Sequence, residues 1–146
     1  VMDTYSMGYS PNTYMDMPIN HKVFLAQFDA IKKIADQGPC VLVGRCADYA
    51  LESYSNCLSI FIHASLDARV KRVARIYDLT DAKAKDMILK ADKKRATYYN
   101  YYTNKKWGAA ESYELCLDSS KLGIQGTVDA IIAYSDMRSK IQNRKI

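Results

Sequence analysis

The hydrophobic pattern of this chain alternates between short apolar runs and segments in which apolar residues recur at helical spacing. Three short runs are typical of strands buried in a parallel sheet, at residues 40–43, 58–62 and 113–117. Five segments have helical periodicity, over about residues 21–37, 47–53, 66–77, 81–102 and 124–142. Strands that alternate with helices predict an α/β fold, and the first two strands with the short helix between them predict a right-handed βαβ unit.

Residues with capping propensity mark the ends of several of these helices. Asn20 is a suitable N-cap for the first helix, and Gly38 with Pro39 ends it. Thr80 is a suitable N-cap for the long fourth helix. The final helix is expected to pack through one apolar stripe, which consists of Ile124, Val128, Ile131 and Ile132.

These elements predict one domain, because the chain has no internal repeat and no low-complexity linker. A chain of 146 residues buries about 70% of its unfolded surface, which is enough for a single core. We expect a three-layer core, in which helices cover a parallel sheet, formed by about residues 20–65 and 111–146. The helices over about 66–110 are an excursion from that core, and residues 1–19 are a loop-rich segment with at most one helical turn.

The composition is that of an ordinary globular protein, with 49% hydrophobic and 25% charged residues. The net charge of +5 favours an anionic partner, and nucleotides, nucleic acids and acidic lipids all fit. The chain has two histidines, and its four cysteines form no CxxC pair, so no metal site is expected.

The cysteines and the hydropathy also indicate a compartment. Cys40 and Cys116 lie in apolar runs and are expected to be buried, and unpaired thiols indicate a reducing environment. No signal peptide occurs, and no apolar stretch approaches the about 20 residues of a membrane helix. We therefore expect a cytoplasmic protein with no membrane partner.

Residues 40–48 form the most informative stretch, because an apolar run ends there at Gly44 and is followed by Arg45 and Asp48. In open α/β sheets, ligands bind beyond the carboxyl ends of the strands. Arginine can hold a phosphate with two parallel hydrogen bonds, so Arg45 and Asp48 are candidate binding residues. The alternative is a surface arginine and a helix-capping aspartate.

Two further charged pairs lie on the predicted helices that follow the second strand. Arg69 and Arg72 are three residues apart and share a helix face, where a transferred phosphate would relieve their repulsion. Asp92 and Arg95 are neighbours too, so that Asp92 could orient Arg95 toward a substrate. The alternatives are a solvated basic face for the first pair and an ordinary surface ion pair for the second.

Aromatic and basic residues are interleaved between Tyr98 and Trp107. This pattern is typical of proteins that stack on single-stranded nucleic acid. The alternative is packing, because Tyr98 and Tyr102 share a helix face at i, i+4. We favour packing and do not expect a nucleic-acid partner.

Polar residues also follow the third strand, at Asp118, Ser119 and Ser120. They would lie in the same crevice as Arg45, where they could line a nucleotide base or its phosphates. A turn that leads into the final helix explains them equally well.

Four segments, in this order, carry a combined resemblance: VGRCADY, FIHASLDARVKRV, DKKRATYYNYYTNKKWG and YELCLDSSKLGIQGTVDAI. Together they resemble the cytidylate kinase-like family of nucleoside monophosphate kinases, over about residues 20–135. The resemblance implies a P-loop kinase fold in which the helical excursion is a mobile lid. It also implies transfer of the γ-phosphoryl group of ATP to CMP, dCMP or a similar nucleotide, with ATP and Mg²⁺ required and the oligomeric state left open.

On the monophosphate side, the resemblance implies four substrate-binding residues. Arg45 matches an arginine of the monophosphate site, and Asp48 is the carboxylate nearest to the strand-end acid of the family. Asp92 and Arg95 match a charged segment that contacts the monophosphate.

On the ATP side, the resemblance implies two catalytic residues and two that bind the cofactor. Arg69 and Arg72 match lid arginines that approach ATP and the transferring phosphate. Ser119 and Ser120 match the loop beside the adenine.

The chain departs from the family pattern at two places. The phosphate loop G-x-x-x-x-G-K-[ST] is absent from the 146 residues, and Val43 stands where better-known cytidylate kinases have an acid. Because the chain begins at Val1, we expect a truncated form that lacks roughly 50 residues, the length of a strand, the loop and its helix. Such a form is expected to be inactive, and the alternative function is a non-catalytic relative that senses nucleotides or binds a partner.

Overall fold

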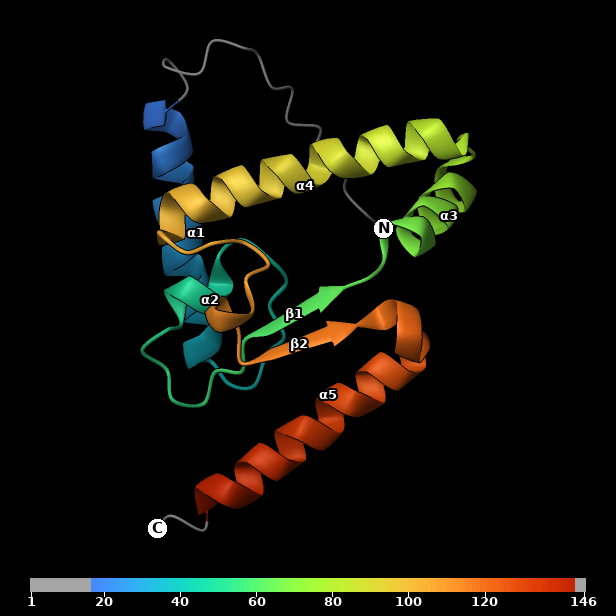
Figure 1. The fold of residues 1–146 in the computed structure, drawn as a ribbon. Coiled ribbons are helices and arrows are strands. Elements are labelled where there is room, and N and C mark those ends of the chain that lie inside the picture. The colour runs from blue at the N-terminus through green and yellow to red at the C-terminus, as the bar shows by residue number, and fades with distance from the viewer. Residues whose placement is uncertain (1–16, 144–146) are drawn as a thin grey trace. The chain divides into compact units, whose positions relative to one another are not determined.

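The computed structural model describes residues 17–143 of the 146-residue chain, with side chains from residue 21 onward. The expected loop-rich segment lies outside the described residues as far as residue 16. The chain divides into two compact units, residues 1–51 and 52–146, and each is described by itself. Figure 1 shows their elements.

The first unit contains the helices α1 (Met17–Asp36) and α2 (Ala47–Ala50). α1 begins before the expected start, so Asn20 lies inside the helix and the prediction that it is the N-cap is wrong. Proline is favoured in the first turn of a helix, and Pro18 occupies that turn. The predicted end is confirmed, since α1 stops just before Gly38, whose φ is 140°.

Residues 40–43 do not form the predicted strand, so the expected βαβ unit is also wrong. Val41 and Val43 are 93% and 89% exposed, which leaves one side of the apolar run in solvent. A strand requires a hydrogen-bonded neighbour, and the described part of this unit contains no other strand. The apolar run therefore predicts that other parts of the protein bury this segment, but the residues near it in the sequence do not bury it.

The second unit contains a parallel sheet of two strands, β1 (Ile60–His63) and β2 (Leu115–Asp118). The register runs from Ile60 opposite Leu115 to His63 opposite Asp118, so both strands end at the same edge. Both predicted strands are confirmed, displaced by one or two residues along the chain. The described residues therefore have an α/β fold that is rich in helix and has a small parallel sheet.

The long connection between the strands is formed by α3 (Leu66–Tyr77) and α4 (Asp81–Thr103), as predicted. The Ser65 hydroxyl accepts a hydrogen bond from the backbone of Ala68 at 3.3 Å, and Thr80 accepts one from the backbone of Lys83 at 3.4 Å. The two helices share a small apolar core of Val70, Ala84 and Ile88, flanked by Leu66, Val73, Ala74 and Leu79. This core makes α3 and α4 a helix pair with its own packing.

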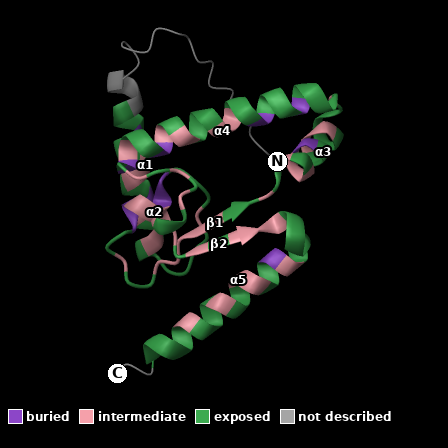
Figure 2. Ribbon diagram, viewed as in Figure 1, coloured by how far each residue is buried: buried purple, intermediate pink, exposed green. Residues whose placement is uncertain are grey.

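α5 (Ser119–Asn143) follows β2 without a loop and packs against both strands. Gly123 interrupts it with a φ of 66°, so the straight part begins at the residue that the sequence predicted. The predicted apolar stripe is largely wrong, because Ile124, Val128 and Ile132 are 70%, 42% and 54% exposed. The buried and half-buried face is rotated and consists of Gly126, Thr127, Ala130, Ile131, Tyr134 and Arg138 (Figure 2).

An aromatic cluster, formed by Phe61, Tyr99, Trp107 and Tyr113, connects the end of α4 to the sheet. Trp107 lies edge-on to Phe61 at 5.4 Å between ring centroids, and Tyr113 stacks on Phe61 at 4.8 Å. Tyr99 stacks on Tyr113 at 6.1 Å. The connection after α4, which includes the unpredicted 3₁₀ helix η1 (Ala110–Ser112), is thereby held on β1.

Gly108 makes the close approach of this connection possible. Its φ is 76°, and a Cβ there would lie 3.2 Å from the Phe61 ring.

Tyr98 and Tyr102 pack on each other at 4.8 Å, which confirms that their spacing places them on one helix face. Among residues 17–143, no helix is both long enough and apolar enough to cross a membrane.

Candidate functional site

Asp92 joins two arginines on the α3–α4 helix pair. One nitrogen of Arg69, Nη2, donates to both carboxylate oxygens of Asp92 at 2.7 Å. Arg95 Nη1 donates to Asp92 Oδ1 at 3.4 Å. Arg69 belongs to α3 and the other two residues to α4, so the first contact crosses between the helices. We call these three residues the Arg–Asp–Arg cluster.

The members of this cluster differ in how firmly they are held. Arg69 and Asp92 have side chains that are 32% and 21% exposed, whereas the Arg95 side chain is 62% exposed. Ion pairs in full contact with water contribute little, and partial burial strengthens them. Arg69 and Asp92 therefore fix each other, while the guanidinium of Arg95 remains accessible to a ligand.

Arg72 lies one turn after Arg69 on α3 and is exposed. Within residues 17–143 its guanidinium makes no ion pair. The three arginines outweigh the one carboxylate, which leaves a net positive charge that suits a phosphate dianion. A carboxylate that already orders two guanidinium groups also reduces the rotamer entropy lost when a ligand binds.

The predicted neighbours Asp92 and Arg95 are thus confirmed as an ion pair, and the structure adds Arg69 to them. The sequence suggested these residues as two separate pairs, each within one helix. The contact between Arg69 and Asp92 spans 23 positions, and helical spacing contains no signal for it.

Arg45 and Asp48 belong to the first unit, in and after a turn that leads into α2. Gly44, Arg45 and Cys46 all have a left-handed backbone, with φ of 69°, 58° and 56°. This conformation is uncommon for residues other than glycine. Arg45 is exposed and makes no hydrogen bond or ion pair with any residue in the described part of the chain.

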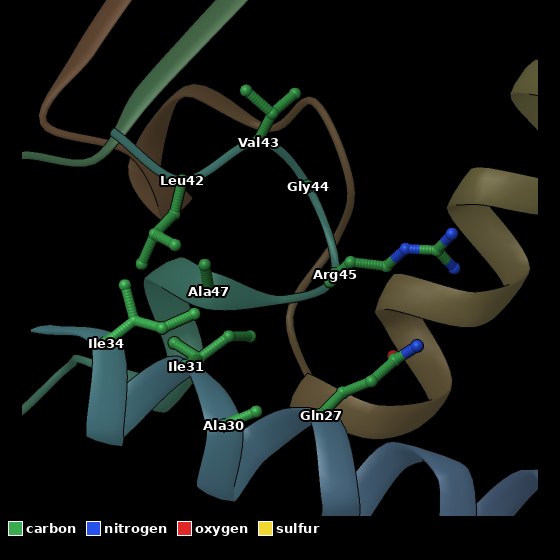
Figure 3. A pocket seen from close by; sticks show the side chains of 9 residues that line it. All are labelled: Gln27, Ala30, Ile31, Ile34, Leu42, Val43, Gly44, Arg45 and Ala47. Atoms are coloured by element: carbon green, nitrogen blue, oxygen red, sulfur yellow. The ribbon is translucent and has the colours of Figure 1, made fainter. Parts of the chain in front are cut away.

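A shallow hollow of about 170 Å³ adjoins this turn and is lined by α1, residues 42–45 and Ala47. Figure 3 shows the Leu42 side chain directed toward Ile34 of α1, whereas Arg45 extends away from these apolar side chains. Small-molecule sites usually measure about 300–1,000 Å³. The hollow is therefore too small to account for nucleotide binding.

Cys46 is buried in the same turn, at 3% exposure. Burial and, second, the negative charge of Asp48 raise the pKa of its thiol to about 11. The exposed positions of Cys40 and Cys116 show that their predicted burial is wrong. Both predictions assumed neighbouring strands on either side, and the described sheet has two strands.

At pH 8, iodoacetamide is expected to alkylate Cys40 and Cys116 at least about a hundredfold faster than Cys46, because the thiolate is the reactive form. Raising the pH toward 11 should accelerate the reaction of Cys46 selectively. Peptide mass spectrometry over time measures each site. The same reaction in guanidinium chloride is the control, where all sites should react alike. Equal rates in the native protein would contradict the burial of Cys46.

A second group of polar residues lies where β1 and β2 end, and we call His63, Asp118, Ser119 and Ser120 the strand-end cluster. Ser119 Oγ donates to the carbonyl oxygen of His63 at 2.9 Å. Asp118 Oδ1 accepts from the hydroxyl of Ser120 at 2.5 Å and from its backbone N–H at 2.9 Å. These hydrogen bonds, then His63 and Lys121, lower the pKa of Asp118.

Ser119 and Ser120, both predicted site residues, therefore lie at the carboxyl end of the sheet. His63 was not identified from the sequence. The available signal was its position as the last residue of a strand that precedes a helix, which places it at the same edge as Asp118. Within the described residues no group of three or more His, Cys, Asp or Glu side chains could hold a metal ion.

The chain is similar to a known protein family and to a solved structure. A family model described as the cytidylate kinase-like family matches residues 1–121. A crystal structure of an uncharacterized protein from Eubacterium ventriosum ATCC 27560 is 34% identical in sequence, with a TM-score of 0.76. The match covers 79% of this chain and 65% of that one, so the chain spans less than two thirds of the length of that relative. A search of curated proteins found no match.

Proposed function

Because the chain belongs to the cytidylate kinase-like family, we propose that it is a nucleoside monophosphate kinase that acts on CMP, dCMP or a similar nucleotide. The observation that carries this proposal is the Arg–Asp–Arg cluster, in which the accessible guanidinium of Arg95 lies beside Asp92 and the ordered guanidinium of Arg69. The proposal includes a three-layer P-loop core, with residues 66–110 as its lid. It also includes a cytoplasmic location, which the unpaired cysteines support.

In the proposed reaction, the chain contributes positioning and charge rather than covalent chemistry. Arg95 binds the phosphate of the monophosphate, and Asp92 holds Arg95 and Arg69 in register. Arg69 and Arg72 stabilise the negative charge on the phosphoryl group during its transfer. Their location on one helix pair lets a single movement of that pair bring these groups to the nucleotide.

The remaining predicted residues complete the two binding sides. Arg45 and Asp48 contribute to the monophosphate side, and Ser119 and Ser120 contribute to the ATP side. When bound, Mg²⁺ neutralises charge on the ATP phosphates. The described residues do not fit a metal site by themselves, and the 146 residues contain no G-x-x-x-x-G-K-[ST] loop, so we assign neither to this chain.

Calorimetry with CMP tests the substrate side of this proposal. CMP is expected to bind at least about tenfold more tightly than cytidine, the matched control without a phosphate, because charge-assisted hydrogen bonds to phosphate are lost with cytidine. Equal affinities for the two would contradict a phosphate site. A chain extended with a strand, a phosphate loop and its helix is expected to convert CMP and ATP into CDP and ADP.

A non-catalytic nucleotide sensor is the second candidate. It is favoured by the absence of the phosphate loop from these residues and by Val43, which stands where better-known cytidylate kinases have an acid. The extended chain separates the two functions. If it binds CMP but transfers no phosphoryl group to any monophosphate, the kinase proposal is wrong and the sensor is supported.

A further inference from the structure

The strand-end cluster lies outside the Arg–Asp–Arg cluster and has chemistry of its own. β1 and β2 are neighbours in register, so His63 and Asp118 end the two strands side by side. Side chains at paired positions of adjacent parallel strands project from the same face of the sheet. An imidazole and a carboxylate are therefore placed together where open α/β sheets bind their ligands.

Only part of the hydrogen-bonding capacity at this edge is used within the protein. Asp118 Oδ1 is occupied by the two hydrogen bonds from Ser120, and Ser119 Oγ is tied to the backbone of His63. No residue in the described part of the chain donates to Asp118 Oδ2, and none hydrogen-bonds to the His63 imidazole. The carboxylate is ionised at neutral pH, since its pKa is lowered by Ser120.

An ionised carboxylate accepts hydrogen bonds but cannot donate them. Asp118 Oδ2 therefore attracts an N–H group and disfavours a carbonyl oxygen or a phosphate. Adenine and cytosine carry an exocyclic amino group, whereas hypoxanthine and uracil carry a carbonyl oxygen at the corresponding position. The His63 ring lies nearly parallel to that of Phe61, at 23° and 6.3 Å, and offers a flat neighbour for a base.

We propose that Asp118 is a specificity-determining residue, which selects a nucleobase with an exocyclic amino group, and that His63 flanks that base. This inference rests on the proposed nucleotide binding and adds the base preference of the strand-end cluster. Serine side chains donate and accept equally well, so Ser119 and Ser120 cannot impose such a preference. Asp118 can, because a site with a fixed acceptor rejects a ligand that lacks the donor.

Nuclear magnetic resonance of the imidazole groups tests the proposal on the 146-residue chain. The chain has two histidines, so the resonance of His63 reports on the strand-end cluster and that of His21, in α1, is an internal control. ATP and inosine triphosphate differ at one edge of the purine, where ATP has an amino group at position 6 and inosine triphosphate has an oxo group there and a proton on N1. ATP is expected to shift the His63 resonance and to bind about five- to tenfold more tightly than inosine triphosphate.

Asp118→Asn is the decisive variant. An asparagine can keep the contacts of Oδ1 with Ser120 and can present either a carbonyl oxygen or an N–H group to the base. The preference for ATP is therefore expected to fall to within about twofold. Asp129→Asn, an exposed aspartate whose carboxylate contacts Gln125 on the same helix, is the matched control and should retain the preference.

Each of the other possible results supports or contradicts the proposed role of Asp118. A titration with CMP and UMP identifies cytosine as the base that is read if the preference appears with that pair and not with the purines. Equal affinities in both pairs, an unchanged preference in Asp118→Asn, or nucleotide binding that leaves His63 unshifted would each overturn the inference while leaving nucleotide binding intact. If calorimetry detects no binding of any of the four nucleotides, the proposed function fails together with it.

Discussion

Replacing Arg95 with alanine is expected to weaken the binding of CMP by about ten- to hundredfold. Arg95 is held by one contact of 3.4 Å and is 62% exposed, so its guanidinium can turn toward a phosphate without disturbing the packing of α4. A hydrogen bond to a charged group contributes about 1.5–3 kcal/mol, and 1.4 kcal/mol corresponds to a factor of ten in affinity. Calorimetric titration of the variant and the unmodified chain gives the ratio directly.

Arg75→Ala is the matched control, because it removes the same charge from the same helix pair. Arg75 is exposed near the end of α3 and makes no ion pair with any residue between 17 and 143. Its replacement should change CMP affinity by no more than about twofold, since exposed charges at a distance are screened by salt. A similar loss in both variants would show a general electrostatic effect and would contradict the role assigned to Arg95.

Local signals in the sequence were sufficient for the helix pair that carries these arginines. Ser65 and Thr80 each satisfy a backbone N–H three residues later, and such caps depend only on neighbours in the chain. The predicted bounds of α3 are therefore those observed, and α4 ends at Thr103, one residue after its predicted end. The same reasoning explains why the end of α1 before Gly38 could be predicted.

Predictions that depended on distant neighbours fared less well. The apolar run at 40–43 and the burial of Cys116 both required strands on either side, and burial is a property of the assembled sheet rather than of a segment. In α5 the predicted residues have the correct helical spacing but lie on the wrong face of the helix. The face that is buried depends on the two-stranded sheet against which the helix packs.

In the candidate site, too, local features could be predicted from the sequence and contacts between distant residues could not. Arg69, Asp92 and Arg95 could each be selected by residue type and helical spacing, whereas their union across the helix pair depends on how α3 packs against α4. His63 was missed for a related reason. A histidine at the end of a strand acquires meaning only when the neighbouring strand places Asp118 beside it.

Replacing Trp107 with alanine is expected to lower the free energy of unfolding by about 2–3 kcal/mol. Truncation of a buried tryptophan usually costs about 3–5 kcal/mol, and Trp107 is half-buried, so we expect less. The loss includes its edge-on contact with Phe61 at 5.4 Å. The backbone N–H of Trp107 donates a hydrogen bond to Asn100 at 2.7 Å, and the substitution leaves this hydrogen bond in place. Urea unfolding followed by circular dichroism measures the change, since the variant has no tryptophan fluorescence.

Tyr77→Ala is the control for the loss of a large aromatic side chain, because Tyr77 is 58% exposed at the end of α3. It should lower the free energy of unfolding by less than about 0.5 kcal/mol. Equal losses would contradict the importance of the aromatic cluster. Because that cluster attaches α4 to β1, the folded Trp107→Ala variant also separates two roles. Unchanged CMP affinity would make the cluster a source of stability alone, whereas reduced affinity would mean that it also positions the arginines of the helix pair.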